Sequence, residues 1–181
     1  ERKASKAQDS ELQQKANQAV AFYIGQTYQT GFGNRFRKKP IEKALLKDPA
    51  NAELRARMAG RKLITGEYEA AQKLLDNTPF GIDHALLHVV EGRLHLVLCD
   101  RARDGTGQTD ASLLANAVSS FEGALKLNRE LGVAWLGLAR TKRLLKDLEG
   151  ATEGINRAMR LLPDQDPSAS IEEYAYEAVM W

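Results

Sequence analysis

Five side chains with metal-binding or acid–base chemistry follow one another along residues 84–99. They are separated by steps of four, three, four and four residues: His84, His88, Glu91, His95 and Cys99. At about 100° per residue, these steps place all five along one stripe of a helix. Zinc needs about four ligands that converge on one point, whereas a single helix brings only an i, i+4 pair to one ion. We therefore interpret the stripe as a polar helix face and expect no metal or cofactor.

Two glycine-containing segments can be compared with phosphate and calcium loops. In TGFGNRFRKKP, residues 30–40, no lysine is followed by Ser or Thr, as a phosphate-binding loop requires. In DRARDGTGQTDA, residues 100–111, Ala102 and Ala111 stand where a calcium loop needs carboxylates. The sequence also has no nucleophile elbow, no catalytic context for its thiol and no distinctive carboxylate pair. It therefore predicts that the protein is not an enzyme.

Composition and charge limit the partners of the chain. Its 181 residues carry 26 Lys and Arg against 24 Asp and Glu, and this net charge of +2 is too balanced for a protein that coats nucleic acid. The single cysteine excludes an internal disulfide. No apolar run is long enough to span a bilayer. The chain opens at Glu1 in a polar, basic run, so we expect a soluble fragment of a longer protein and favour a cytoplasmic location. A membrane tether in a segment outside this chain stays open, since basic residues suit the cytoplasmic side of a membrane anchor.

A pattern of small and apolar residues recurs along the chain. Apolar residues follow steps of three and four, and Gly25 and Ala59 stand 34 residues apart at equivalent places. The positions that repeat are small, aromatic or proline residues of paired helices: Gly25, Tyr28, Ala44, Pro49, Ala59, Tyr68, Ala71, Ala117, Phe121, Ala124, Trp135, Ala139, Ala151, Ala158 and Pro163. Small residues at these places let two helices approach closely, so the pattern predicts an all-α fold of helix pairs.

This pattern resembles the tetratricopeptide repeat, whose units are antiparallel helix pairs of about 34 residues. The resemblance covers residues 17–163 and implies a right-handed superhelix of stacked hairpins, an α-solenoid. In a single domain, we expect units near residues 9–49, 50–79, 83–129 and 132–163, a loop insert near residues 100–111 and a capping helix near residues 168–181. Pro79 predicts a short second helix in the second unit, and Pro40 predicts a helix that starts near Lys38 or Lys39.

The first helix of the third unit allows two frames. In the preferred frame the inward residues are Leu87, Val90, Leu94 and Val97, which share one stripe at 100° per residue. The other frame puts Gly92 where the helices cross and would bury Glu91 and His95. We expect the first frame because it buries only apolar side chains.

The resemblance implies a non-catalytic scaffold that binds a partner protein or peptide on a concave face lined by the first helices. The family's groove positions fall on these residues: Phe22, Gln26, Ala56, Gly60, His88, Gly92, His95, Leu136, Arg140 and Arg143. Gly60 and Gly92 would leave room for a ligand or ease helix packing, and the two arginines favour an acidic segment. Chaperone-docking members of the family have asparagines at the positions that hold Gln26 and Gly60 here, so we do not expect chaperone docking. We expect instead a scaffold within a multiprotein assembly, including one at a membrane.

Two alternatives to this function stay open. A secondary docking loop for the partner is expected at Arg35, Phe36, Arg37 and Lys38. The basic loop at residues 35–39 could instead bind nucleic acid, although the near-neutral charge argues against it. Open terminal faces would instead allow the chain to assemble with copies of itself.

Overall fold

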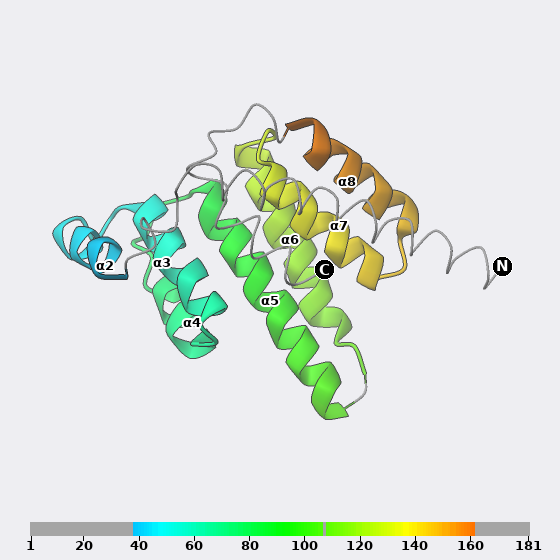
Figure 1. Cartoon of the computed structure of the whole chain (residues 1–181), viewed down its shortest axis with the longest axis horizontal. Coiled ribbons are helices and arrows are strands. Elements are labelled where there is room, and N and C mark those ends of the chain that lie inside the picture. The colour runs from blue at the N-terminus through cyan, green and yellow to red at the C-terminus, as the bar shows by residue number, and fades with distance from the viewer. Residues whose placement is uncertain (1–37, 107, 162–181) are drawn as a thin grey trace, which may run out of the picture. The chain divides into compact units, whose positions relative to one another are not determined.

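The computed structural model of the chain describes residues 38–106 and 108–161 (Figure 1). Within these residues the fold is all-α, with seven helices and no strand. The helices are α2 (Lys38–Lys47), α3 (Ala52–Ile64), α4 (Tyr68–Asp76), α5 (Ala85–Thr106), α6 (Ala111–Leu127), α7 (Gly132–Leu144) and α8 (Leu148–Leu161). Whereas the sequence predicts one domain, the chain divides into two compact units, one holding α2–α6 and the other α7 and α8.

Prolines limit two helices as the sequence predicts. α2 begins at Lys38, so Pro40 falls in the first helical turn, where a missing N–H costs no hydrogen bond within the helix. α4 has nine residues and ends at Asp76, ahead of Pro79. The helix bounds therefore agree with both expectations.

The loop insert expected near residues 100–111 is much shorter than predicted. α5 continues without a break to Thr106, and α6 begins at Ala111. Asp100 and Arg103 form an ion pair of 3.2 Å, one helical turn apart, in the last part of α5. Polar residues alone do not end a helix when their side chains can pair at i, i+3, so the helix extends past the apolar stretch.

Three helices begin at a residue whose side chain satisfies a backbone N–H of the first turn. Asn51 caps α3, Asp110 caps α6 and Asp147 caps α8. In each case a side-chain oxygen accepts a hydrogen bond of 2.9 to 3.2 Å from the backbone. Because the first four N–H groups of a helix have no partner within it, these caps fix where each helix starts.

The turns after α3 and α7 have the same hydrogen bonds. After α3, Gly66 N donates to Leu63 O at 3.1 Å and Glu67 N donates to Lys62 O at 2.8 Å. After α7, Lys146 N donates to Arg143 O at 3.0 Å and Asp147 N donates to Lys142 O at 2.9 Å. This is the Schellman arrangement of a helix C-terminus. Both turns reverse the chain within three residues, so α4 packs on α3 and α8 packs on α7.

α5 is the central helix of the α2–α6 unit and packs against α3, α4 and α6. The inward residues of the preferred frame are all buried: Leu87, Val90, Leu94 and Val97. Gly92 is buried as well, because the ring of Phe121 on α6 lies over it; a Cβ at Gly92 would come within 2.8 Å of that ring. A second side of α5 thus packs against α6 at Gly92, whereas Glu91 and His95, which the other frame would bury, are only half-buried.

α7 and α8 cross at small residues. Ala139 and Ala151 are fully buried, together with Ile155. A Cβ at Gly154 would lie 2.9 Å from the Cβ of Ala139, so the two helices approach too closely there for any larger side chain. The prediction that Ala139 lies buried where paired helices cross is confirmed.

The repeat positions fall into three groups. Eight are fully buried: Ala59, Ala71, Ala117, Phe121, Ala124, Ala139, Ala151 and Ala158. Ala44, Tyr68 and Trp135 are half-buried and Pro49 is exposed, while Gly25, Tyr28 and Pro163 lie outside the described residues. The expectation of burial is thus met by the small residues of α3 to α8.

Arg55 joins three parts of the α2–α6 unit. Its side chain is buried, and its guanidinium donates to the carbonyl of Leu74 at 3.1 Å and to that of Pro49 at 2.5 Å. Leu74 lies in the last turn of α4 and Pro49 follows α2. A cation at the carbonyl end of a helix is stabilising, so Arg55 holds α4 and the α2–α3 connection against α3.

Candidate functional site

Polar residues of α5 gather with one residue before the helix and one on α6. We call this group the α5 cluster: Asp83, His88, Glu91, His95 and Ser120. His88 Nε2 lies 2.7 Å from Asp83 Oδ1, and its Nδ1 lies 3.6 Å from Glu91 Oε2. The Ser120 hydroxyl donates to Glu91 Oε2 at 3.2 Å. The cluster thus connects α5 to the segment before it and to α6.

Local sequence explains how the cluster is positioned. His88 and Glu91 are three residues apart, and Glu91 and His95 four, so all three lie on one face of α5. The imidazole of His88 packs against α6 at Gly123, where a Cβ would meet Nδ1 at 3.3 Å. A glycine at residue 123 therefore lets the ring lie close to α6 while both nitrogens face carboxylates.

The charges of the cluster support one another. The Glu91 carboxylate raises the pKa of His88 most, partial burial opposes this, and Asp83 adds to the increase. The hydrogen bond with His88 lowers the pKa of Glu91 most, against the effect of burial, and the Ser120 hydroxyl lowers it further. His95 differs, because burial lowers its pKa and the nearby Glu91 only partly offsets that effect. His88 therefore favours its charged form and His95 its neutral form.

The other members of the predicted polar stripe have separate structural roles. His84 Nδ1 accepts a hydrogen bond of 3.2 Å from Leu86 N at the start of α5. Cys99 is buried, and its thiol donates to the carbonyl of Asp110 at 3.7 Å. The described ranges, 38–106 and 108–161, contain no group of three or more His, Cys, Asp or Glu residues placed to hold a metal ion. The histidines are thus used one at a time along the helix.

The cluster has ion-pairing geometry rather than the geometry of a nucleophile and its base. The Ser120 hydroxyl donates to a carboxylate, and both nitrogens of His88 face other carboxylates. A nucleophilic serine would need a basic nitrogen within hydrogen-bond distance of its oxygen. What this arrangement can do is hold charge of both signs at a half-buried surface of α5.

Four of the predicted groove residues lie in the interior. Ala56, Leu136 and Arg140 are at most 4% exposed, and Gly92 is covered by Phe121. The prediction that these four residues line an open groove is therefore wrong. It requires each first helix to be covered on one side only, whereas α3, α5 and α7 have buried residues on several sides.

Four other groove residues remain half-exposed: Gly60, His88, His95 and Arg143. Gly60 faces α5, since a Cβ there would meet Val90 at 3.5 Å. Phe22 and Gln26 lie outside the described residues, as do Arg35, Phe36 and Arg37 of the secondary docking loop, whereas Lys38 is the first residue of α2. Of the predicted residues, His88 and His95 lie on one face of α5, about two helical turns apart.

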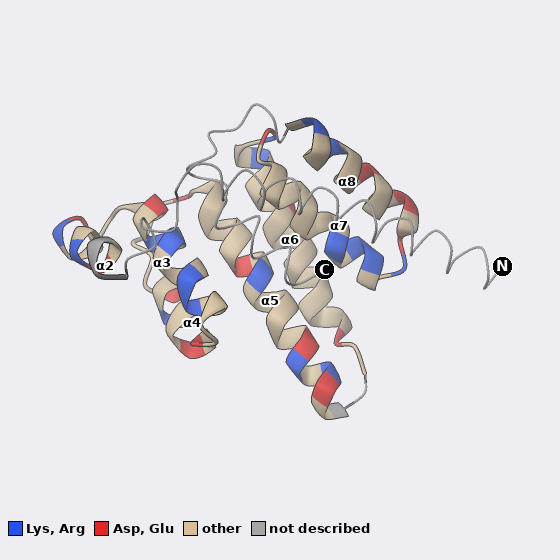
Figure 2. Cartoon of the chain, viewed as in Figure 1, with Lys and Arg blue, Asp and Glu red and all other residues tan. Residues whose placement is uncertain are grey.

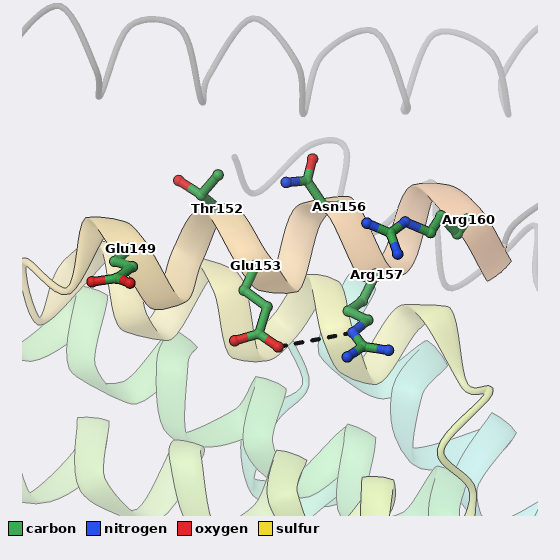
Figure 3. A pocket seen from close by; sticks show the side chains of 6 residues that line it. All are labelled: Glu149, Thr152, Glu153, Asn156, Arg157 and Arg160. Carbon is green, nitrogen blue, oxygen red and sulfur yellow. Dashed lines mark ion pairs between the residues drawn. The ribbon is translucent and has the colours of Figure 1, made fainter.

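Six polar residues of α8 line a pocket, and Figure 3 shows their side chains: Glu149, Thr152, Glu153, Asn156, Arg157 and Arg160. Arg157 pairs with Glu153 at 3.8 Å, and its guanidinium lies 5.9 Å from the ring centre of Trp135. Two acids and two bases share this face, so it favours neither an anionic nor a cationic ligand.

Sequence reasoning missed Asp83 and Ser120. Asp83 stands five residues before His88 and outside the helix, so no helical spacing connects the two. Ser120 is 29 residues from Glu91. Only the packing of α6 on α5 brings the hydroxyl and the carboxylate together, and nothing in the local sequence signals this contact.

No protein-family model matches the chain, and no curated protein does either. Its own geometry is therefore the basis for assigning a function.

Proposed function

We propose that the chain is a non-catalytic protein–protein interaction scaffold built from tetratricopeptide-type helical hairpins. The observation that carries the proposal is the likeness between the α3–α4 and α7–α8 hairpins. Their turns contain the same two backbone hydrogen bonds at corresponding positions. Corresponding ion pairs join Lys62 to Glu67 at 2.5 Å and Lys142 to Asp147 at 3.6 Å. Recurrence of one hairpin design along a chain is typical of helical repeat proteins.

Small buried residues support the same proposal. Ala59 and Ala71 in one hairpin correspond to Ala139 and Ala151 in the other, and all four are fully buried. In the α5–α6 hairpin, Gly92 takes the place of the small residue in the first helix, 33 residues after Ala59. This spacing is close to the roughly 34 residues of a tetratricopeptide unit.

The binding surface we propose is the accessible side of the first helices. In the α2–α6 unit it includes His88 and His95 of α5, and in the α7–α8 unit Arg143 of α7. Arg143 carries positive charge, so an acidic segment of another protein is a partner that suits α7, while the α5 cluster offers charge of both signs. The α5 cluster has ion-pairing geometry, which suits the binding role proposed here.

The proposal is tested by affinity capture from an extract of the source organism with the full chain as bait. His95→Ala is compared with Asn116→Ala, an exposed residue of α6, and Arg143→Ala with Arg160→Ala on α8. We expect the chain and both controls to retain the same protein, and each first-helix variant to weaken its capture about tenfold, or about 1.4 kcal/mol. Unchanged capture by both first-helix variants would disprove the assigned surface, and the absence of any specific partner would disprove the scaffold.

A further inference from the structure

The basic run that begins in TGFGNRFRKKP continues into α2. Residues 35–47 contain six Lys or Arg and a single acid, Glu42, although the whole chain has a net charge of only +2. α2 begins at Lys38 and so contains four of the six basic residues (Figure 2). The scaffold proposed above makes no use of this concentration of charge.

α2 has one side against the protein and one side in solvent. It packs on α3, and its apolar residues Ile41, Ala44 and Leu45 are half-buried. The opposite side carries Lys43, Leu46 and Lys47, all exposed, with Leu46 at 81%. At 100° per residue these three occupy an arc of about 100°. We call them the lysine face.

We propose that the lysine face of α2 binds an anionic lipid surface. Lysines suit this role because their long apolar stems can lie along the lipid while the ammonium groups reach the phosphates. An exposed leucine between two lysines adds an apolar side chain that can enter the interface. α2 as a whole has four lysines, and clusters of four to eight basic residues on a helix are typical of peripheral binding to acidic lipids. The complementary charge thus identifies the occupant as a membrane surface.

Other macromolecules fit the lysine face less well. Protein interfaces are depleted in lysine, and their strongest contacts come from Trp, Tyr and Arg, none of which occurs in α2. Single-stranded nucleic acid is bound by aromatic side chains that stack on bases, and α2 has no aromatic residue either. The lysine face combines ammonium groups, which can pair with lipid phosphates, with an aliphatic side chain, which can enter the apolar part of a lipid interface.

The proposed contact is peripheral. No helix within residues 38–106 or 108–161 has the length and apolarity to cross a bilayer. Glu42 is half-buried, and Asp48, just beyond α2, is exposed and accepts a hydrogen bond of 3.1 Å from Asn51. These two acids oppose anionic lipid, so the binding we propose is moderate and sensitive to salt.

The test is sedimentation of the full chain with lipid vesicles. Vesicles of phosphatidylcholine are compared with vesicles in which about one third of the lipid is phosphatidylserine, at about 0.1 M and about 0.5 M salt. We expect partitioning onto the phosphatidylserine vesicles alone, and loss of it at the higher salt. Lys43→Glu with Lys47→Glu should lower the partition coefficient at least about tenfold, and Leu46→Ser about threefold.

The matched control is Lys73→Glu with Lys126→Glu, which changes net charge equally at exposed lysines of α4 and α6. It should lower partitioning by less than about twofold. An equal loss in the control pair, or no binding to phosphatidylserine vesicles, would overturn the proposal. Tighter binding of a labelled oligonucleotide at the same salt, lost in the α2 pair, would assign the face to nucleic acid instead. The lysine face includes neither His95 nor Arg143, so either proposal can fail without the other.

Discussion

Gly66 and Lys146 hold the same backbone conformation at the same place in two hairpin turns. Their φ angles are 76° and 67°, and each lies two residues after the last residue of its helix, α3 or α7. Glycine adopts this left-handed region without steric cost, whereas the Cβ of a lysine is crowded against the backbone there. The two hairpins therefore share one geometry, and only the first has the residue type that suits it.

Lys146→Gly should stabilise the protein by about 0.5 to 1 kcal/mol, because it removes this crowding at a helix C-terminus. Urea unfolding followed by circular dichroism measures the change. Ala115→Gly, at an exposed position in the middle of α6, is the control and should destabilise by about 1 kcal/mol. A loss of stability in Lys146→Gly would mean that the strain at this turn is absent.

Gly92→Ala should destabilise the α2–α6 unit by about 1 to 3 kcal/mol. The added methyl group would meet the Phe121 ring at 2.8 Å, and Phe121 is fully buried and cannot move away without disturbing α5 and α6. The control is the same change in the same helix: Gly105→Ala meets nothing within 4 Å. It should be neutral or stabilise by up to about 1 kcal/mol, because alanine is the better helix former. Equal effects in thermal melts would contradict the packing described for α5.

The two half-exposed histidines of α5 should give opposite pH dependence. The pKa of His88 is raised above 6.5, so its contribution to stability is fully present below pH 6.5 and disappears as the pH rises through the folded-state pKa. The pKa of His95 is lowered below 6.5, so the unfolded chain takes up this proton first, and stability falls as the solution is acidified below pH 6.5.

His88→Gln should therefore cost more stability at about pH 5.5 than at about pH 8.5, and His95→Gln should cost less at about pH 5.5. Urea unfolding of both variants and of the unchanged chain at the two pH values measures these differences. Glu91 stays ionised at both, since its pKa is lowered from 4.5. If each variant loses the same stability at both pH values, the ion pairs of the α5 cluster do not form in solution.

Arg55→Met should destabilise the α2–α6 unit by about 1 to 3 kcal/mol, although methionine retains most of the apolar stem. The change removes the donors to the carbonyls of Leu74 and Pro49. Arg57→Met, on the same helix, is the control. Arg57 pairs with Glu53, at 2.8 Å and one turn away, and such pairs contribute about 0.3 to 0.5 kcal/mol. If urea unfolding shows an equally small loss of unfolding free energy in both variants, the bridging role of Arg55 is contradicted.

Several features of the fold follow from short stretches of sequence. Pro40 and Pro79 limit α2 and α4 because proline acts on the backbone within one turn. The spacing of Leu87, Val90, Leu94 and Val97 predicts one buried side of α5. Ala59 and Ala139 are recognisable because small residues at regular intervals indicate closely packed helices. Each of these signals lies within a few residues of the feature it predicts.

The features that the sequence left undetermined depend on contacts between distant residues. Phe121 covers Gly92 from a different helix, Ser120 reaches Glu91 across 29 positions, and Arg55 reaches the carbonyl of Leu74 across 19. For the same reason the sequence could place Arg140 on a groove, whereas the tertiary structure buries it. Helical periodicity determines which residues share a side of a helix. The packing of the other helices decides which of those sides are covered, and that packing depends on the whole chain at once.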